Sequence, residues 1–184
     1  MPNGKKVMIK QLDSPPSSGQ FEEMLFDLAD DWRGEDWHYV LFTMTNGQEW
    51  CGHFREKEGG NLLTAILESE NIACIVSGGH GYIIDVDKKS KIKDIDCDVI
   101  ISLASDDRSS SFIISTYWDI QRIDNNLNQT EISLPMQIQA DGIYFTDKHD
   151  GIQNLEIEEV GPGLNRNKNY YIDLNDWIVK KHSA

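Results

Sequence analysis

Cysteine and histidine side chains are the first residues of this sequence to consider for chemistry. Cys51 and His53 are two positions apart, so a strand would place both on one face. Together with His80 or His149 they could ligate zinc, or a cysteine and a histidine could form a nucleophile with its base. A C-x-H spacing alone is not a zinc pattern, however, and we expect Cys51 to pack in a core and His53 to hydrogen-bond locally. The sequence therefore predicts no metal site, no cofactor and no catalytic residue.

A glycine-rich segment, SGGHG at residues 77–81, is the second candidate site. Glycine-rich turns can cradle phosphate, but this one lacks the Lys and Ser/Thr of a P-loop, and strand-like residues follow it. We therefore predict a β-hairpin turn. An alternative function stays open here: a small-molecule-binding or hydrolytic enzyme domain with its site near Gly78 to Tyr82 and with His53 or His80 as acid–base group.

Alternating aspartates between residues 85 and 98 offer oxygen ligands of the kind that divalent cations prefer. The EF-hand pattern is absent, because the glycine and glutamate that it needs at fixed positions are missing. Lysines at positions 88, 89, 91 and 93 nearly cancel the aspartates. We expect a solvated edge strand whose charges prevent further pairing.

The net charge of the chain is −14, from 17 basic and 31 acidic residues. Such a charge repels phosphate, so we expect neither nucleic acid nor an anionic membrane as a partner. Residues 21–36 hold seven carboxylates and one arginine, and residues 141–160 hold six carboxylates and one lysine. These two segments favour solubility, or they form a surface that steers and captures a basic partner.

The candidate partner-binding residues come from these two acidic segments. Two tryptophans beside the first segment are candidate anchors, since buried aromatic side chains dominate interface energies, although core packing explains Trp32 equally well. The candidates are Glu22, Glu23, Asp27, Asp30, Asp31, Trp32, Glu35, Asp36, Trp37, Asp147, Asp150, Glu156, Glu158 and Glu159.

The elements that must position these residues are one helix and many short strands. Apolar residues at helical spacing, with acidic residues between them, predict an amphipathic helix over about 20–33. Aromatic and β-branched residues at 37–45 and 48–55 flank Asn46-Gly47 and predict a hairpin. Residues 61–69 form a short helix or a covering loop, and residues 174–179 a helix or strand.

From residue 71 onward the sequence alternates apolar runs with turn residues. The fold class predicted is α+β, predominantly β, with antiparallel meander or hairpin sheets in a sandwich-like or partial-propeller-like arrangement. We expect a flexible segment at 1–19 and a single domain at 20–184. The strands are predicted at 72–77, 81–86, 98–104, 111–116, 119–123, 131–138, 142–146, 153–159 and 169–173.

The compartment is predicted from what the sequence lacks. The first residues have no apolar run of signal-peptide length, and no stretch has the roughly 20 apolar residues of a membrane helix. Three cysteines without CxxC spacing do not indicate a disulfide framework. We expect a reduced, cytoplasmic protein.

Short motifs between residues 50 and 175 carry a family resemblance. In order they are WCGHFR at 50–55, GYIID at 81–85, WDI at 118–120 with ID at 123–124, DGI at 141–143 and IDL at 172–174. Their order and spacing resemble bacterial immunity proteins of polymorphic or contact-dependent toxin systems. The predicted helix is not part of this resemblance.

The resemblance implies a cytoplasmic, acidic protein without catalysis of its own. Such a protein binds the C-terminal domain of one cognate toxin and blocks its active site or substrate entry. A toxin that cuts nucleic acid has a basic cleft, which would suit the net charge. We expect a monomer or weak homodimer; the rival is an oligomeric structural subunit that pairs through apolar strands at 98–123.

Overall fold

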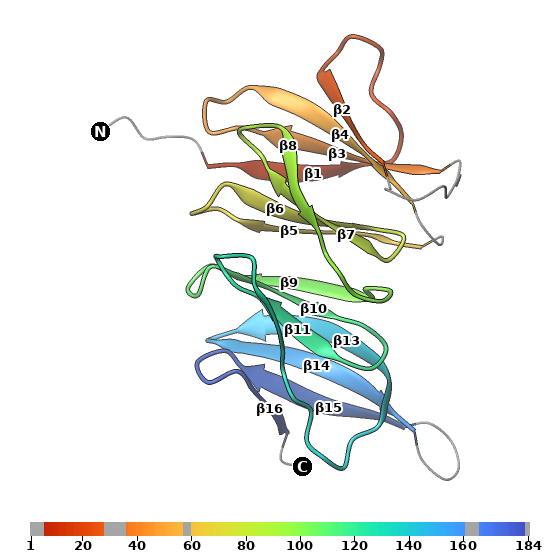
Figure 1. Cartoon of the computed structure of the whole chain (residues 1–184), viewed down its shortest axis with the longest axis vertical. Helices are drawn as coiled ribbons and strands as arrows, with labels where there is room; N and C mark the ends of the chain where they lie inside the picture. The colour runs from red at the N-terminus through yellow and green to blue at the C-terminus, as the bar shows by residue number, and fades with distance from the viewer. Residues whose placement is uncertain (1–5, 28–35, 57–59, 161–165, 183–184) are drawn as a thin grey trace. The chain divides into compact units, whose positions relative to one another are not determined.

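The computed structural model describes residues 6–27, 36–56, 60–160 and 166–182 (Figure 1). These residues form sixteen strands in four sheets, with no helix among them. The chain divides into two compact units, Met1–Asp98 and Val99–Ala184. Within the described ranges there is accordingly no helix long and apolar enough to cross a membrane.

The first unit contains two four-stranded sheets. One has the order β1-β3-β4-β2 and the other the order β5-β6-β7-β8 (Figure 1). Their strands are β1(Met8–Leu12), β2(Glu22–Phe26), β3(Trp37–Thr43), β4(Glu49–Arg55), β5(Leu62–Leu67), β6(Ile72–Ser77), β7(His80–Asp85) and β8(Ser90–Asp94).

Two tight turns in this unit follow the local sequence closely. The predicted hairpin at Asn46-Gly47 is confirmed: Gly47 has a φ of 82°, and Asn46 Oδ1 accepts a hydrogen bond from the Gln48 amide at 2.8 Å. Gly78 and Gly79 connect β6 to β7 with φ angles of 53° and 81°. The glycine-rich segment is thus a hairpin turn, as its sequence predicts.

The core of the first unit lies between its two sheets and is rich in aromatic rings. Phe42 stacks on Trp50 with ring centroids 4.3 Å apart, and Phe54 meets Tyr82 of the opposite sheet at 5.3 Å. Trp50 Nε1 donates to the Val86 carbonyl at 3.0 Å, so its single polar atom is satisfied although the side chain is fully buried.

The predicted helix at 20–33 is wrong, and the fold class is therefore all-β rather than α+β. Residues 22–26 form β2, which pairs in parallel with β4, while residues 28–35 lie outside the described ranges. Phe26 is buried and stacks on Phe54 at 4.9 Å, whereas Leu25 is 69% exposed. The side chains of residues 22–26 alternate between two faces, as they do in a strand. The hydrogen bonds that the backbone of β4 offers to these five residues outweigh their weak preference for a helix.

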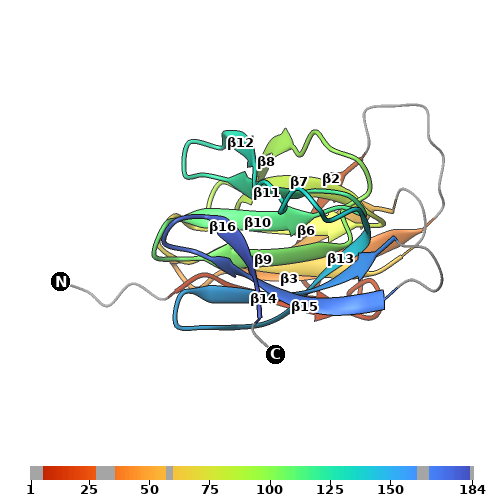
Figure 2. The same cartoon turned by 90° about the horizontal axis from the view of Figure 1, so that it is seen from below.

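The second unit also contains two four-stranded sheets, ordered β12-β11-β10-β9 and β13-β14-β15-β16. Figure 2 shows β14 and β15, two neighbouring strands of the second of these sheets, side by side. The strands are β9(Ser102–Asp106), β10(Ser111–Ser115), β11(Ile120–Ile123), β12(Gln129–Glu131), β13(Ala140–His149), β14(Ile152–Glu159), β15(Arg166–Asp173) and β16(Ile178–Lys181).

A second apolar core joins the two sheets of this unit. Ile113 and Ile120 from one sheet pack with Ile143, Leu155 and Ile172 from the other, and all five are buried. Ser115 Oγ adds a polar connection, since it donates to the Ile143 carbonyl at 2.5 Å.

Three further predictions of secondary structure need correction or completion. Residues 62–67 form strand β5, neither helix nor loop, and the chain closes with strand β16. The strand predicted at 131–138 is wrong apart from residue 131, which ends β12, and residues 132–138 are not in a strand. Pro135 has no amide hydrogen for a sheet, and its carbonyl accepts from the Ile138 amide at 2.9 Å in a turn.

Candidate protein-binding surface

Two carboxylates of the first acidic segment pair with cations from elsewhere in the first unit, one on β4 and one in the turn between β7 and β8. Arg55 on β4 binds Asp27 with two hydrogen bonds, of 2.6 Å from Nε and 3.1 Å from Nη2. The same guanidinium lies 4.1 Å from the ring centroid of Trp37. Lys89 forms an ion pair with Glu22. The structure therefore brings Asp27 and Trp37 together around a cation of the chain itself.

The structure describes two of the remaining candidates of this segment and does not describe the other four. Glu23 lies beside His53, and Asp36 is exposed ahead of β3. Asp30, Asp31, Trp32 and Glu35 lie outside the described residues.

Cys51 and His53 do share one face of β4, but their environment does not suit nucleophilic chemistry. His53 Nε2 is 3.2 Å from Glu23 Oε2, without the geometry of a hydrogen bond. Burial, with a smaller contribution from Glu23, raises the pKa of the Cys51 thiol to about 11. The thiol is therefore protonated at neutral pH, whereas the nucleophile is a thiolate.

His80 lies in a different sheet from His53 and contacts a different carboxylate. Its Nε2 atom is 3.0 Å from Asp94 Oδ1, and Lys91 binds the same carboxylate. The two candidate histidines thus interact with separate acidic residues, Glu23 and Asp94. Within the described ranges, no group of three or more His, Cys, Asp or Glu residues could hold a metal ion.

The second acidic segment forms most of the hairpin β13–β14. Glu156 and Glu158 alternate with the buried Leu155 and Ile157, so they lie on the outer face of the sheet. Asp147 and Asp150 are exposed near the tip of the hairpin.

Glu159 is the member of the segment that is turned toward the chain's own groups. Its carboxylate binds Lys168 and accepts a hydrogen bond from the hydroxyl of Tyr170. Burial and this carboxylate raise the pKa of Tyr170 to about 12. Glu159 is therefore a poor candidate for contact with a partner.

Lys148, the only cation of the segment, points away from the outer face. Its Nζ lies 3.3 Å from Oδ1 of Asp106, a buried carboxylate at the end of β9. Glu156 instead accepts a hydrogen bond from the neutral amide of Asn167. The negative charge of Glu156 is therefore not cancelled by that contact.

Three exposed aromatic side chains adjoin these carboxylates. Tyr144 on β13 is directly opposite Glu156 in the sheet and is 41% exposed. Burial raises the pKa of Tyr144, and the charges of Glu158, Tyr117, Asp141 and Glu156 add to the effect. Tyr144 is thus within electrostatic reach of Tyr117 and of all three carboxylates.

A short turn between β10 and β11 presents the other two aromatic residues. Thr116 Oγ1 accepts hydrogen bonds from the amides of Trp118 and Asp119, both at 3.1 Å. This turn holds Tyr117 and Trp118 at its tip, where they are 37% and 58% exposed. Because Ser115 binds the Ile143 carbonyl, the base of the turn is fixed next to the strand that carries Tyr144.

The acidic–aromatic surface is the name we give to this group. Glycine at position 142 is part of its construction: a Cβ there would come within 2.7 Å of the Tyr144 ring. A register shift between Ala140 and Ile143 places this glycine where the strand bulges. The surface consists of Tyr117, Trp118, Asp141, Tyr144, Glu156 and Glu158.

Sequence reasoning found two of the six residues of this surface. Glu156 and Glu158 were candidates because of their charge, but the three aromatic residues were not. The signal available for two of them was TYWD at 116–119, where two aromatic residues occupy a turn that Thr116 and Asp119 stabilise. A scan against protein-family models and a search of curated proteins find no match for this chain.

Proposed function

We propose that this chain is a toxin-neutralising immunity protein. In this proposal it has no catalysis of its own and acts in the cytoplasm, where it binds and blocks a basic toxin domain, with a nuclease domain as the first candidate. The acidic–aromatic surface carries the proposal, because it combines exposed tyrosine and tryptophan with the carboxylate of Glu156, whose charge the neutral amide of Asn167 does not cancel.

The chemistry of the surface suits arginine and lysine side chains. A cation can pair with Glu156 while it lies over the ring of Tyr144, which is directly opposite in the sheet. Tyrosine and tryptophan are also the residues that most often dominate the binding energy of an interface. The recognition residues proposed are thus the six residues of the acidic–aromatic surface, which include Asp141, Glu156 and Glu158 of the second acidic segment.

The net charge supports the same kind of partner. At −14, the chain attracts a basic domain from a distance and accelerates encounter, while it repels nucleic acid. Carboxylates on a rigid sheet would occupy the cleft where such a toxin binds phosphate. None of the three cysteines forms a disulfide, which supports a reducing compartment.

The test is co-expression with the product that is encoded immediately upstream. The proposal predicts that the two proteins co-purify as a complex with one copy of each. It also predicts that cells expressing the toxin domain survive only when this chain is present. It is wrong if the purified chain binds no neighbouring product at micromolar concentration and protects no cells.

A further inference from the structure

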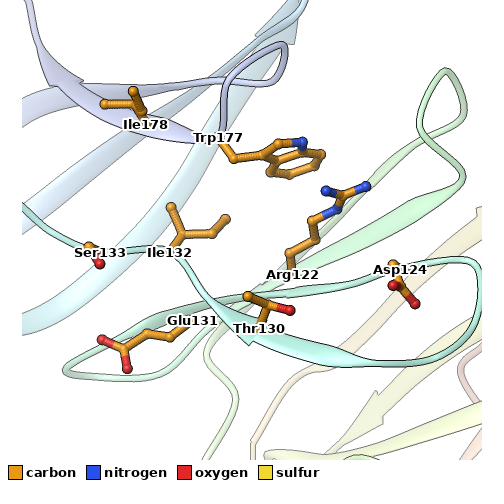
Figure 3. Close-up of a pocket in the computed structure, with 8 residues that line it drawn as sticks. All are labelled: Arg122, Asp124, Thr130, Glu131, Ile132, Ser133, Trp177 and Ile178. Atoms are coloured by element: carbon orange, nitrogen blue, oxygen red, sulfur yellow. The ribbon is translucent and has the colours of Figure 1, made fainter.

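A pocket in the second unit lies apart from the residues of the acidic–aromatic surface. It has a volume of about 380 Å³ and opens between the end of β11, strand β12 and the turn before β16 (Figure 3). This size is in the range of small-molecule sites. The side chains of Arg122 and Trp177 lie against each other in the pocket lining, with Ile132 beside them.

The guanidinium of Arg122 is held in one orientation. Its Cζ lies 4.1 Å from the ring centroid of Trp177, and its Nε donates to the buried Ser111 Oγ at 3.0 Å. Among the arginines whose side chains the structure describes, Arg55 pairs with Asp27 and Arg108 with Asp106. No carboxylate in the described part of the chain forms an ion pair with Arg122 at 4.0 Å or less.

Asp124, which lines the same pocket, interacts electrostatically with Arg122, but its hydrogen bonds are formed within a turn. Asp124 Oδ1 accepts hydrogen bonds from the amides of Asn126 and Asn128, both at 2.9 Å. Its other oxygen accepts from the Asn128 side chain at 3.2 Å. This carboxylate therefore closes the β11–β12 turn, and Arg122 itself lines the pocket.

Trp177 has a backbone conformation that is unusual for a bulky residue. Its φ of 59° lies in the left-handed region, where the backbone of a residue with a bulky side chain is strained. Glycine or asparagine would satisfy the turn alone. The Trp177 amide donates to the Asp173 carbonyl at 2.7 Å, and the resulting turn holds the indole over Arg122. Strained residues of this kind are concentrated at ligand-binding sites.

We propose that this pocket binds a small organic molecule with one carboxylate and a flat apolar body. The fork of Arg122 receives the carboxylate with two hydrogen bonds, and the side chains of Trp177 and Ile132 contact the apolar body. Glu131 at the rim and the net charge of the chain disfavour a dianion such as phosphate. This site does not depend on the proposed function.

The test uses benzoate and 2-naphthoate as probes, with benzamide as the neutral analogue and inorganic phosphate as the competing anion. Binding to the full chain is followed by nuclear magnetic resonance at the indole N–H of Trp177, which is assigned by its loss in Trp177→Phe. We expect at least one carboxylate to bind with a Kd of about 1 mM or lower, and benzamide about tenfold more weakly.

Two variants test the role of Arg122. Arg122→Gln removes the fork and is expected to weaken carboxylate binding at least about tenfold. Arg122→Lys keeps the positive charge and replaces the first variant in the test if Arg122→Gln does not fold. It too should bind the carboxylates more weakly than the wild type does. Arg108→Gln, an arginine of the same unit outside the pocket, should bind as the wild type does.

Three results would overturn the proposal. The first is that neither benzoate nor 2-naphthoate shifts the Trp177 signal. The second is that benzamide or phosphate binds as tightly as the two carboxylates. The third is that folded Arg122→Lys retains the full affinity of the wild type.

Discussion

At the scale of single residues, burial and partners decide what a reactive side chain does. Cys51 and His53 have the right types and the right spacing, and their shared face was predictable. Their chemistry was not, because the sequence does not show that Cys51 is fully buried or that Glu23 lies beside it. The same limit applies to Lys148, whose contact with Asp106 joins residues far apart in sequence.

Trp118 provides the residue-scale prediction for the proposed function. It is 58% exposed at the tip of a well-defined turn, so its removal leaves the core intact. Trp118→Ala is expected to weaken binding of the toxin domain by about 2 kcal/mol, or roughly 30-fold, as measured by calorimetry. Met136→Ala removes another exposed apolar residue of the same unit and should leave affinity unchanged. Equal affinity of both variants would exclude Trp118 as an anchor.

Asp106 provides a second prediction, which concerns stability and pH. Burial alone would raise the pKa of this carboxyl, but hydrogen bonds from Ser109 and Lys148 outweigh it and lower the pKa. The stabilisation is therefore present above the unfolded pKa of about 3.9 and is lost as the pH falls through the lower folded value.

Asp106→Asn should reduce the free energy of unfolding at pH 7 by about 1–3 kcal/mol. The difference in unfolding free energy between the variant and the wild type should shrink below about pH 4. Urea titrations at pH 7 and below about pH 4 measure it. Asp107→Asn, at the exposed neighbouring position, serves as the control and should have little effect. A destabilisation that is independent of pH would contradict the assigned role of the Asp106 charge.

At the scale of elements, local signals predicted the hairpins and failed where pairing partners are distant. The Asn46-Gly47 turn and strand β6 follow from residues within a few positions, so they could be predicted. Strand β2 could not, because its stability comes from β4, more than twenty positions later in the sequence. The alternation of Phe26 and Leu25 is visible only when the strand is known.

Strand β2 can be distinguished from the predicted helix by two substitutions at adjacent positions. Phe26→Ala should lower the free energy of unfolding by about 3–5 kcal/mol, because it leaves a cavity against Phe54 and Trp50. Leu25→Ala should change it by less than about 0.5 kcal/mol. The measurement is chemical denaturation of both variants. A helix with the predicted apolar face would instead make Leu25 costly to remove.

At the scale of the whole molecule, the net charge of −14 is distributed in a way that composition alone does not reveal. Both acidic segments were identified in the sequence. The difference between them could not be predicted, because Arg55 reaches the first segment from β4 and Lys89 from the turn between β7 and β8. Lys148, by contrast, turns away from the face that carries Glu156. This difference is the reason for assigning recognition to the second segment.

The most direct measurement of the central claim compares two double charge reversals in calorimetric binding of the upstream toxin domain. Glu156→Lys with Glu158→Lys places the reversal on the acidic–aromatic surface. Asp98→Lys with Asp107→Lys makes the same change in net charge at exposed positions outside it. We expect the reversal at Glu156 and Glu158 to weaken binding about a hundredfold. The reversal at Asp98 and Asp107 should weaken it less than about threefold. Equal losses, or no loss in the first pair, would contradict this expectation.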